Sequence, residues 1–523
     1  MTRDRRDGDP HRSERLPGRP LPRRIVTAAP ALLALDVGTS RCRAAVLTPS
    51  GDVLAEASRP TPVETGAGGA AVVDVDRIWS DVAALARTTT AGIDVAAIGV
   101  AAQLGTVFLD DRREPLLPAM LWADRRAAGE AEELAGTAGA ASLDLARRPI
   151  AAELHGPRLR WLRRHRPSAA TAVRGIVSLK DAIVLRLTGA LVTDETHASY
   201  SGLFDVAGRR WSPELCRLND VPMALLPEAR PAVAPAGRLT EAAAGALALR
   251  PGLPVSVGGS DGTLGTLGGG AVRAGVTVDV AGTTDVLLHI AAHPGAPGGG
   301  AIANAHAVPG LWSIGGPTGM TGGAVSWIAG MLGHPTVGEA LAALPDAIGT
   351  AAAPSVGPPY FYPALSGSRF PRWRPTDRGS LVGLSPDDGP ASLLRAAAEG
   401  AAFVLRQGLA VLEAAGLAVD DLVVVGGAAH HAGLLQLRAD VLGRPLRIAA
   451  NAEASGIGAA MTAGLAAGLF ADAGEAAAAM VRDAGVIRPD AGRARLYAEK
   501  FRLWSASLGL DGPPGAEATP VRS

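Results

Sequence analysis

The sequence predicts an α/β fold made of two related domains with a cleft between them. Apolar runs typical of strands alternate with segments of helical periodicity, which is characteristic of α/β proteins. Two similar turns, at residues 35–40 (LDVGTS) and 280–285 (VAGTTD), each follow a β-rich run and lie about half a chain apart. A length of 523 residues favours two or three domains. We therefore expect a duplicated α/β domain.

The first ordered elements are expected to be a strand, a hairpin, a helix and a second strand. Residues 31–38 (ALLALDVG) form a short apolar run that ends in glycine, as a buried strand entering a turn does. The segments 41–47 and 53–55 flank the turn residues PSGD and predict a β-hairpin. Residues 76–90 have helical spacing and residues 95–101 are strand-like.

The domain boundary is predicted near residues 250–254 (RPGLP), between an Ala-rich helical stretch and the next strand. The two domains then span residues 31–250 and 251–505, followed by a flexible tail at 506–523. Residues 1–30 are expected to form a disordered basic tail, because residues 1–27 hold eight Arg against four acidic residues and no apolar run before Ile25.

Composition excludes several classes of protein. Fifty basic residues balance fifty acidic ones, which argues against a nucleic-acid binder, and two cysteines exclude a disulfide scaffold or a Cys-rich metal site. The one candidate membrane span, residues 454–471, is mostly Ala and Gly and is interpreted as a tightly packed buried helix. We expect a cytoplasmic protein with no nucleic-acid or membrane partner. A homodimer is compatible with the sequence.

Only two of the fifty basic residues are lysines, Lys180 and Lys500. Lys180 precedes Asp181 and follows a strand-like run, so we predict a structural ion pair that could support a neighbouring pocket. Lys500 lies in a terminal segment of helical character and is expected to be solvated.

The turn at residues 36–40 has the composition of a phosphate-binding loop. Gly38 permits close approach of the backbone, Thr39 and Ser40 add hydroxyl donors, and Asp36 is suited to hold Mg²⁺ directly or through water. An ordinary strand-to-hairpin turn is the alternative.

Residues 257–270 (VGGSDGTLGTLGGG) place one carboxylate, Asp261, among glycines after a strand. A carboxylate beside a phosphate donor can take the proton of an acceptor hydroxyl. Alternatively, Asp261 caps a helix that begins near Gly262, and one residue could serve both purposes.

Residues 423–430 (VVVGGAAH) repeat the pattern of a strand followed by glycines and a helix, which fits a nucleotide lying on the backbone. His430 and His431 are interpreted as surface or packing residues, and no metal-ligand pattern accompanies them.

Taken together and in this order, the motifs resemble those of the FGGY carbohydrate kinases over residues 31–505. The resemblance implies two actin-like, ribonuclease-H-like ATPase domains, the first binding a sugar and the second a nucleotide. It also implies ATP and Mg²⁺ as cofactors, with Asp36 at the metal and Asp261 as catalytic base. The loops that resemble the family's nucleotide-binding segments contribute Gly38, Thr39, Ser40, Gly282, Thr283, Thr284, Gly426, Gly427 and Ala428.

Further segments resemble the family's signatures and its sugar-binding residues. Residues 157–162 (PRLRWL) resemble the first signature, with Arg158 where Lys is usual, and residues 379–399 resemble the second. Segment 102–106 (AQLGT) lies where xylulokinases have a sugar-contacting stretch, with Leu104 and Gly105 in place of its Met and His. Segment 121–126 (LWADRR) resembles a stretch shared by xylulokinase-like and gluconokinase-like members. The implied substrate contacts are Gln103, Leu104, Gly105, Trp122, Asp124 and Asp261.

The aromatic segment 360–373 resembles a further loop of the family, and we expect it to close over substrate or to pack between the two halves. Arg369 is its best candidate for a phosphate or sugar contact. The expected function is therefore ATP-dependent phosphorylation of a small sugar or sugar acid, with D-xylulose or a related ketose as the first choice. A gluconokinase or polyol kinase is the alternative, and an actin-like nucleotide-binding protein without phosphotransfer is more remote.

Overall fold

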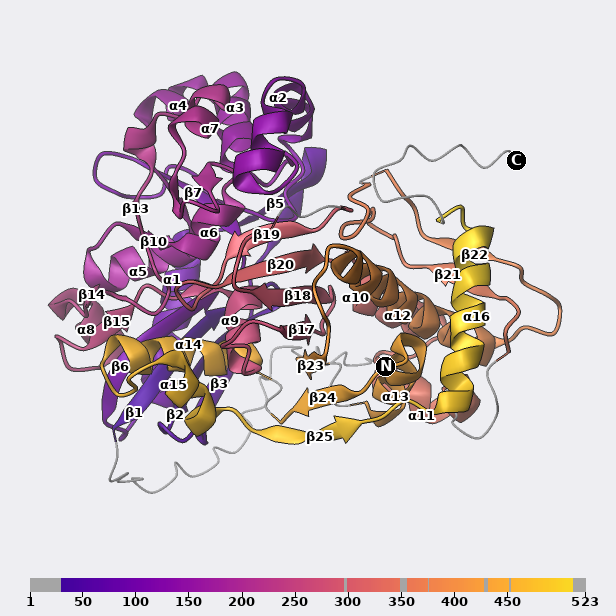
Figure 1. Ribbon diagram of the computed structural model, residues 1–523. Helices are drawn as coiled ribbons and strands as arrows, with labels where there is room; N and C mark the ends of the chain where they lie inside the picture. The colour runs from indigo at the N-terminus through magenta and orange to yellow at the C-terminus, as the bar shows by residue number, and fades with distance from the viewer. Residues whose placement is uncertain are drawn as a thin grey trace, which may run out of the picture.

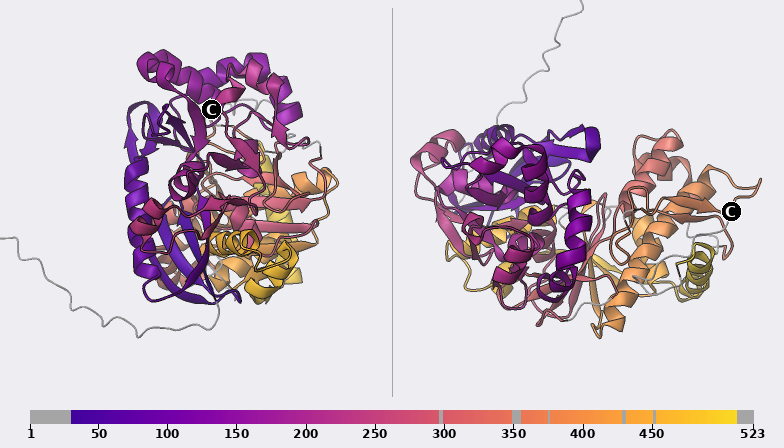
Figure 2. Two further views of the ribbon diagram at one scale, coloured as in Figure 1. Left: turned by 90° about the vertical axis from the view of Figure 1, so that its left-hand side faces the viewer. Right: turned by 90° about the horizontal axis from the view of Figure 1, so that it is seen from above.

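The computed structural model describes residues 30–510, apart from residues 296–298, 349–354, 375, 428–430 and 451–452. The predicted tail at 1–30 lies outside these residues except for Pro30. The predicted flexible tail at 506–523 begins too early, because helix Ala491–Ser507 includes its first two residues and Leu510 is buried; residues 511–523 lie outside the described residues. Two lobes stand side by side, an N-terminal one coloured indigo to magenta and a C-terminal one coloured orange to yellow (Figures 1 and 2). Each lobe is built around a seven-stranded mixed sheet, so the predicted α/β architecture is confirmed.

The N-terminal sheet has the order β14-β15-β6-β1-β2-β3, with β16 also paired to β6. At its centre, β1 runs antiparallel to β2 and parallel to β6. The predicted strand, hairpin, helix and strand are all present, and the two parallel strands β1 and β6 are buried along nearly their whole length, as expected for the centre of a sheet covered on both faces. The sheet and its covering helices comprise β1 (Ala31–Val37), β2 (Arg41–Leu47), β3 (Val53–Pro60), α1 (Val75–Thr89), β6 (Val95–Ala102), α5 (Leu179–Thr188), β14 (Pro235–Arg238), α8 (Glu241–Leu247), β15 (Pro254–Ser256) and β16 (Gly259–Ser260).

The C-terminal sheet repeats this arrangement. Its order is β19-β20-β18-β17-β23-β24-β25, and β17 runs antiparallel to β18 and parallel to β23. Each Gly-Thr turn therefore joins a central strand to its antiparallel neighbour, and the internal repeat predicted from two short motifs is present in the topology. The elements are β17 (Val276–Val280), β18 (Val286–Ala291), β19 (Ile302–Ala305), β20 (Trp312–Pro317), α10 (Thr321–Met331), α11 (Val337–Ala343), α12 (Pro390–Ala414), β23 (Asp421–Val425), α13 (Ala432–Leu442), β24 (Leu446–Ala449), β25 (Asp483–Ile487) and α16 (Ala491–Ser507).

A smaller five-stranded sheet, β4-β5-β8-β7-β9, extends the N-terminal lobe and carries the segment 102–126. Arg158, on α3 (His155–His165), is fully buried beneath it and donates to Thr106 Oγ1 at 2.8 Å and to the carbonyls of Met120 and Leu121. This arginine thereby fixes the strands that lead into the site. The other elements of this region are β4 (Glu64–Gly66), β5 (Ala70–Val73), β7 (Gly105–Leu109), β8 (Ala119–Leu121), α2 (Ala128–Ala141), α4 (Pro167–Ala172), β9 (Gly175–Ser178), β10 (Val192–Asp194), α6 (Glu195–Tyr200), β11 (Phe204–Asp205), β12 (Arg210–Trp211), α7 (Pro213–Leu218) and β13 (Glu228–Arg230).

The predicted boundary at residue 250 falls too early. Strands β15 and β16 both pair with β6 in the N-terminal sheet, through Val255 with Ile98 and Gly259 with Ala101. The N-terminal sheet therefore continues to Ser260. The Ala-rich stretch and the Pro-Gly turn gave a local break, but a loop within a domain has the same composition as a linker between domains.

Helix α14 (Ala454–Ala466), from late in the chain, returns to cover the N-terminal sheet (Figure 1). It packs on α9 (Asp261–Gly268) at a backbone distance that only glycines permit, since a Cβ on Gly458 would lie 2.0 Å from the carbonyl oxygen of Leu264. The small residues therefore serve close packing, as predicted. Within the described part of the chain, no helix is long and apolar enough to span a membrane.

The two lysines are both buried. Lys180 Nζ contacts Asp181 at 2.6 Å and Asp194 at 3.1 Å and donates to the carbonyl of Val257, so its predicted ion pair is confirmed. Lys500, expected to be solvated, instead pairs with Glu399 at 2.7 Å and is 3% exposed. That prediction is wrong because α16 packs against α12 and α13, which the sequence of one helix does not reveal.

Candidate active site

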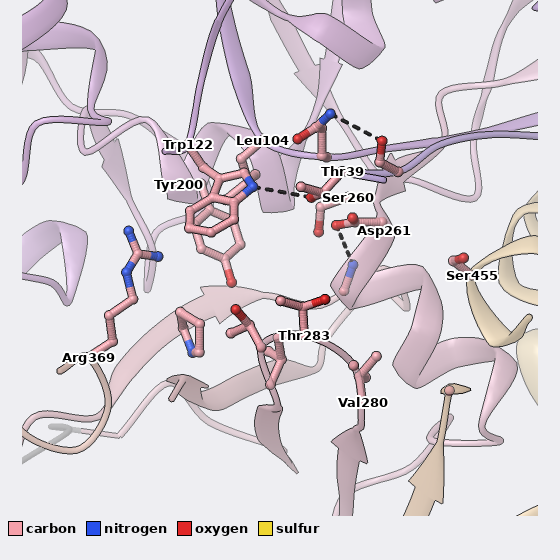
Figure 3. Close-up of a pocket in the computed structure, with 18 of the residues that line it drawn as sticks. Thr39, Leu104, Trp122, Tyr200, Ser260, Asp261, Val280, Thr283, Arg369 and Ser455 are labelled. Carbon is pink, nitrogen blue, oxygen red and sulfur yellow. Dashed lines mark hydrogen bonds between the residues drawn. The ribbon is translucent and has the colours of Figure 1, made fainter. Parts of the chain in front are cut away.

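One cavity of about 440 Å³ lies between the two central sheets (Figure 3). It brings together most of the residues singled out from sequence, although they come from segments up to 391 positions apart. Those that line it are Asp36, Gly38, Thr39, Ser40, Gln103, Leu104, Trp122, Asp261, Gly282, Thr283, Thr284, Arg369, Gly426 and Gly427.

The first loop connects β1 to β2 and is held from below. The Gly38 amide donates to the Arg41 carbonyl at 3.0 Å, and the Gly38 carbonyl accepts from Thr61 Oγ1 at 2.7 Å and from Gln103 Nε2 at 3.2 Å. Thr39 Oγ1 accepts from the indole nitrogen of Trp122 at 3.2 Å. The loop is thus fixed while its outer face stays open to the cavity.

Asp36 is suited to a cation. It lies at the end of β1, 4% exposed, where Oδ2 accepts from Ser455 Oγ at 2.6 Å and Oδ1 has no partner among the described residues. Burial raises the pKa of Asp36 to about 7, and the neighbouring Asp261 adds to the rise. An orphaned buried carboxylate oxygen fits a hydrated Mg²⁺, which commonly takes one or two protein carboxylates and completes its shell with water and phosphate oxygens. The described residues contain no preformed cluster of three or more metal ligands.

The second loop connects β17 to β18 and rests on the glycine turn after β23. The Ala281 amide donates to the Val425 carbonyl at 2.8 Å. Gly426 has φ +93°, and a Cβ there would lie 2.5 Å from the Ala281 carbonyl oxygen, so the position requires glycine.

A buried ion triad braces the same loop from behind. Arg438 on α13 donates to Asp279 Oδ2 at 2.6 Å and to Asp285 Oδ2 at 3.0 Å. These two carboxylates flank the residues 281–284, so one guanidinium fixes both ends of the loop.

Asp261 occupies the first position of α9, at the junction between the loops. The helix cap is Ser260, whose side chain accepts from the Thr263 amide at 3.2 Å, so the capping role considered for Asp261 belongs to its neighbour. Asp261 Oδ1 accepts from the Gly262 amide at 2.7 Å. Burial raises the pKa of Asp261, which strengthens the carboxylate as a base.

The opposite end of the cavity is lined by aromatic and charged side chains (Figure 3). Arg369 pairs with Glu153 at 3.1 Å and its guanidinium lies 5.1 Å from the Trp122 ring centre. Gln103 is 1% exposed and its Oε1 has no partner in the described part of the chain, which leaves an acceptor for a ligand hydroxyl. Figure 3 places Trp122 and Tyr200 between Arg369 and Asp261, with Ser455 on the far side.

Two of the described predicted site residues, Gly105 and Asp124, do not line the cavity. Gly105 belongs to strand β7, and Asp124 is fully buried, where it pairs with Arg126 at 2.6 Å and accepts from the Ala71 amide. Their direct contact with a substrate stays a prediction that this arrangement does not favour, because the Asp124 side chain supports the Trp122 loop from below. Ala428 lies outside the described residues.

Several lining residues were missed by sequence reasoning: Arg43, Arg148, Glu153, Tyr200, Glu453 and Ser455. Ser455 opens the Ala/Gly-rich segment that drew attention only as a membrane candidate. Tyr200 is one of four tyrosines, and this rarity was the single available signal. Arg148 is one arginine among many and belongs to no motif.

Family models match nearly the whole described chain. Residues 31–268 match the N-terminal domain, and residues 278–467 the C-terminal domain, of the FGGY family of carbohydrate kinases. The chain belongs to this family. It is accordingly an ATP-dependent carbohydrate kinase, and the predicted family and enzyme class are confirmed.

Curated and solved relatives agree with this assignment. A glycerol kinase of Dechloromonas aromatica (strain RCB) is 33% identical over 85% of this chain and 90% of its own. A xylulose kinase of Klebsiella pneumoniae is 30% identical over 76% of this chain and 81% of its own. The crystal structure of xylulose kinase from Rhodospirillum rubrum superposes with a TM-score of 0.82 at 29% identity, covering 91% of this chain and 98% of that one.

Proposed function

We propose that the kinase transfers the γ-phosphoryl group of ATP to a hydroxyl of a small polyhydroxylated acceptor, with Asp261 as general base. D-Xylulose or a related ketose is the first acceptor to consider. The observation that carries the proposal is the position of Asp261 on the wall of one cavity, between two Gly-Thr loops and an end lined by Trp122 and Gln103.

The nucleotide would lie against the second loop and the Gly426 turn. Backbone amides of the two loops, with the hydroxyls of Thr39 and Thr283, can donate to phosphate oxygens without a lysine. The braced geometry of both loops means that these donors need little rearrangement when the transferring group gains charge. Arg43 and Glu453, which pair with each other, line the same end.

The acceptor would lie between Trp122 and Asp261. The indole face suits the carbon chain, and the free Gln103 oxygen can accept from one hydroxyl. A second hydroxyl would face Asp261, which takes its proton as the oxygen attacks phosphorus; its raised pKa favours that transfer near neutral pH.

Asp36 would hold Mg²⁺, through its orphaned oxygen or through water. The ion would offset the negative charge of the phosphate groups. Ser455 keeps the carboxylate oriented by its hydrogen bond to the other oxygen. Binding of a cation would also stabilise the charged form of a carboxylate whose burial otherwise favours protonation.

Glycerol and gluconate are the alternative acceptors. The relatives include glycerol kinases as well as xylulose kinases, so a polyol such as glycerol is a second candidate and an aldonate such as gluconate a third. Retention of Asp36 and Asp261 in the cavity favours phosphotransfer over a nucleotide-binding protein that has lost it.

ADP release from Mg·ATP should be measured with D-xylulose, D-ribulose, glycerol, xylitol and D-gluconate, and the product identified by mass spectrometry. We expect at least one acceptor to raise turnover by about 100-fold over the rate with water. Equal ADP release with and without every acceptor would contradict the proposal.

A further inference from the structure

Arg148 is a buried arginine on the wall of the acceptor end. It follows the short helical turn Ser142–Ala146, is 5% exposed and lines the cavity. Its guanidinium carbon lies 4.5 Å from the centre of the Tyr200 ring, and one of its terminal nitrogens donates to Asn304 Oδ1 on β19. The side chain is therefore held in place by both lobes.

Arg148 has no counter-ion in direct contact among the described residues. No ion pair joins its nitrogens to a described carboxylate, and its Nε has no hydrogen-bond partner; the charge of Glu153 acts on it only from a greater distance. Two other buried arginines are better satisfied. Arg438 lies between two aspartates, and Arg158 donates to three neutral oxygens, whereas Arg148 donates to one. Burial lowers the pKa of Arg148 to about 10, so the group stays charged at neutral pH.

A buried cation that has neither an anion nor a full set of hydrogen-bond acceptors is unfavourable, and a bound anion would supply both. The nearest acidic side chain on this wall, Glu153, is already paired with Arg369. The acceptor end therefore carries one uncompensated positive charge beside the Trp122 and Tyr200 rings. Asp261 does not compensate it by direct contact, since its Oδ1 accepts from the Gly262 amide and no ion pair joins it to an arginine among the described residues.

We propose that Arg148 is the counter-ion of an acidic group on the acceptor, and that the kinase prefers a sugar acid to the neutral sugar or polyol of the same length. This inference rests on the proposed function and narrows its acceptor. The acidic group is a carboxylate: one planar guanidinium, with the Tyr200 hydroxyl as a second donor, matches two oxygens in a plane. A phosphate dianion would call for more positive charge than this wall offers.

The position of Tyr200 supports a single acceptor that reaches both groups. The ring contacts Arg148, and burial raises the pKa of its hydroxyl, with Arg148, Asp261 and Arg369 as its charged neighbours. A molecule lying along Trp122 and Tyr200 can place a carboxylate at Arg148 and a hydroxyl at Asp261. D-Xylulose is then a secondary acceptor, and D-xylonate is preferred to it.

The test compares acceptors that differ only in the acidic group: D-gluconate against D-glucitol, and D-xylonate against xylitol and D-xylulose. For the wild-type enzyme we expect kcat/KM to be at least about 10-fold higher for the acid of a pair. Glycerol 3-phosphate serves as the phosphate-bearing probe and should be a poorer acceptor than either acid.

Variants then assign the preference to a residue. Arg148→Met should lower the acid-to-polyol ratio of kcat/KM by about 100-fold, and Arg148→Lys should retain part of it. Arg112→Met is the matched control, because Arg112 is exposed and does not line the cavity; its ratio should stay within about 2-fold of wild type. Thermal unfolding of each variant checks that the fold is retained.

The outcomes separate the two proposals. No turnover with any acceptor would overturn the proposed function itself. Turnover by the wild-type enzyme with an acid-to-polyol ratio of kcat/KM at or below one would overturn only the carboxylate preference. A higher kcat/KM for glycerol 3-phosphate than for the acids would overturn it as well. Both measurements use the wild-type enzyme, so misfolding of a variant cannot affect them. An acid preference that is unchanged in Arg148→Lys and Arg148→Met would overturn the role of Arg148.

Discussion

The two ends of the cavity are built differently. The nucleotide end consists of backbone turns with glycine and small hydroxyl residues, repeated in two sheets of the same topology and braced from behind by buried ion pairs. The acceptor end consists of large side chains from four separate segments, including Trp122, Glu153, Tyr200 and Arg369. We infer that the first end fixes the reaction class while the second sets the acceptor, because side chains can change there without disturbing a backbone loop.

The largest expected effect concerns the junction of the two ends. Asp261→Asn should lower kcat by about 1,000-fold, because the amide cannot take the acceptor proton. ATP affinity, measured by calorimetry, should change by less than about 3-fold, since Asp261 is not assigned to the nucleotide. Asp111→Asn, at an exposed position, is the control. Wild-type turnover in Asp261→Asn would remove the base assignment.

The bracing of the nucleotide end predicts a stability effect. Arg438→Met leaves Asp279 and Asp285 buried without their cation, so the free energy of unfolding should fall by about 3–5 kcal/mol. Urea unfolding measures it. Arg447→Met, which breaks partly exposed pairs with Asp421 and Asp483 in the same lobe, should cost about 1–2 kcal/mol. Equal losses in the two variants would show that the triad is not a special support.

Replacing Asp36, the residue assigned to the cation, should stabilise the protein in a pH-dependent way when Mg²⁺ and ATP are absent. The pKa of Asp36 in the folded protein, about 7, exceeds its ordinary value of 3.8, so burial of the charge destabilises the fold increasingly as pH rises between these values. Asp36→Asn should therefore raise the free energy of unfolding by about 2–4 kcal/mol at pH 8 and by half of that or less at pH 5. Thermal unfolding across this range checks the sign; a gain that grows toward low pH would contradict it.

The smallest effect tests the glycine requirement. Gly426→Ala places a Cβ against the Ala281 carbonyl at a left-handed φ, so nucleotide affinity should fall by about 10-fold. Gly330→Ala, in α10 with no atom within 4 Å of the added Cβ, should leave that affinity unchanged. An unchanged affinity in Gly426→Ala would mean that the turn adapts and does not define the nucleotide end.

The same contrast explains what the sequence could predict. Strand–Gly–Thr turns are local patterns, so the two loops, the repeat and Asp261 were recognisable in a single chain. Arg148, Tyr200 and Ser455 reach the cavity only through tertiary packing, and no local spacing marks them. The burial of Lys500 and the continuation of the first sheet to Ser260 were missed for the same reason, since both depend on a partner distant in sequence.

The central claim is that ATP binds at one end of the cavity and the acceptor at the other, so that the γ-phosphoryl group passes between them beside Asp261. It is tested most directly by following the label from enzyme-bound [γ-³²P]ATP in a single turnover, with the best acceptor of the panel present. We predict that the label appears on the acceptor in an amount equal to the ADP formed, and that Asp261→Asn slows this transfer while its bound ATP stays intact. Release of the label as inorganic phosphate, at the same rate with and without the acceptor, would contradict the account.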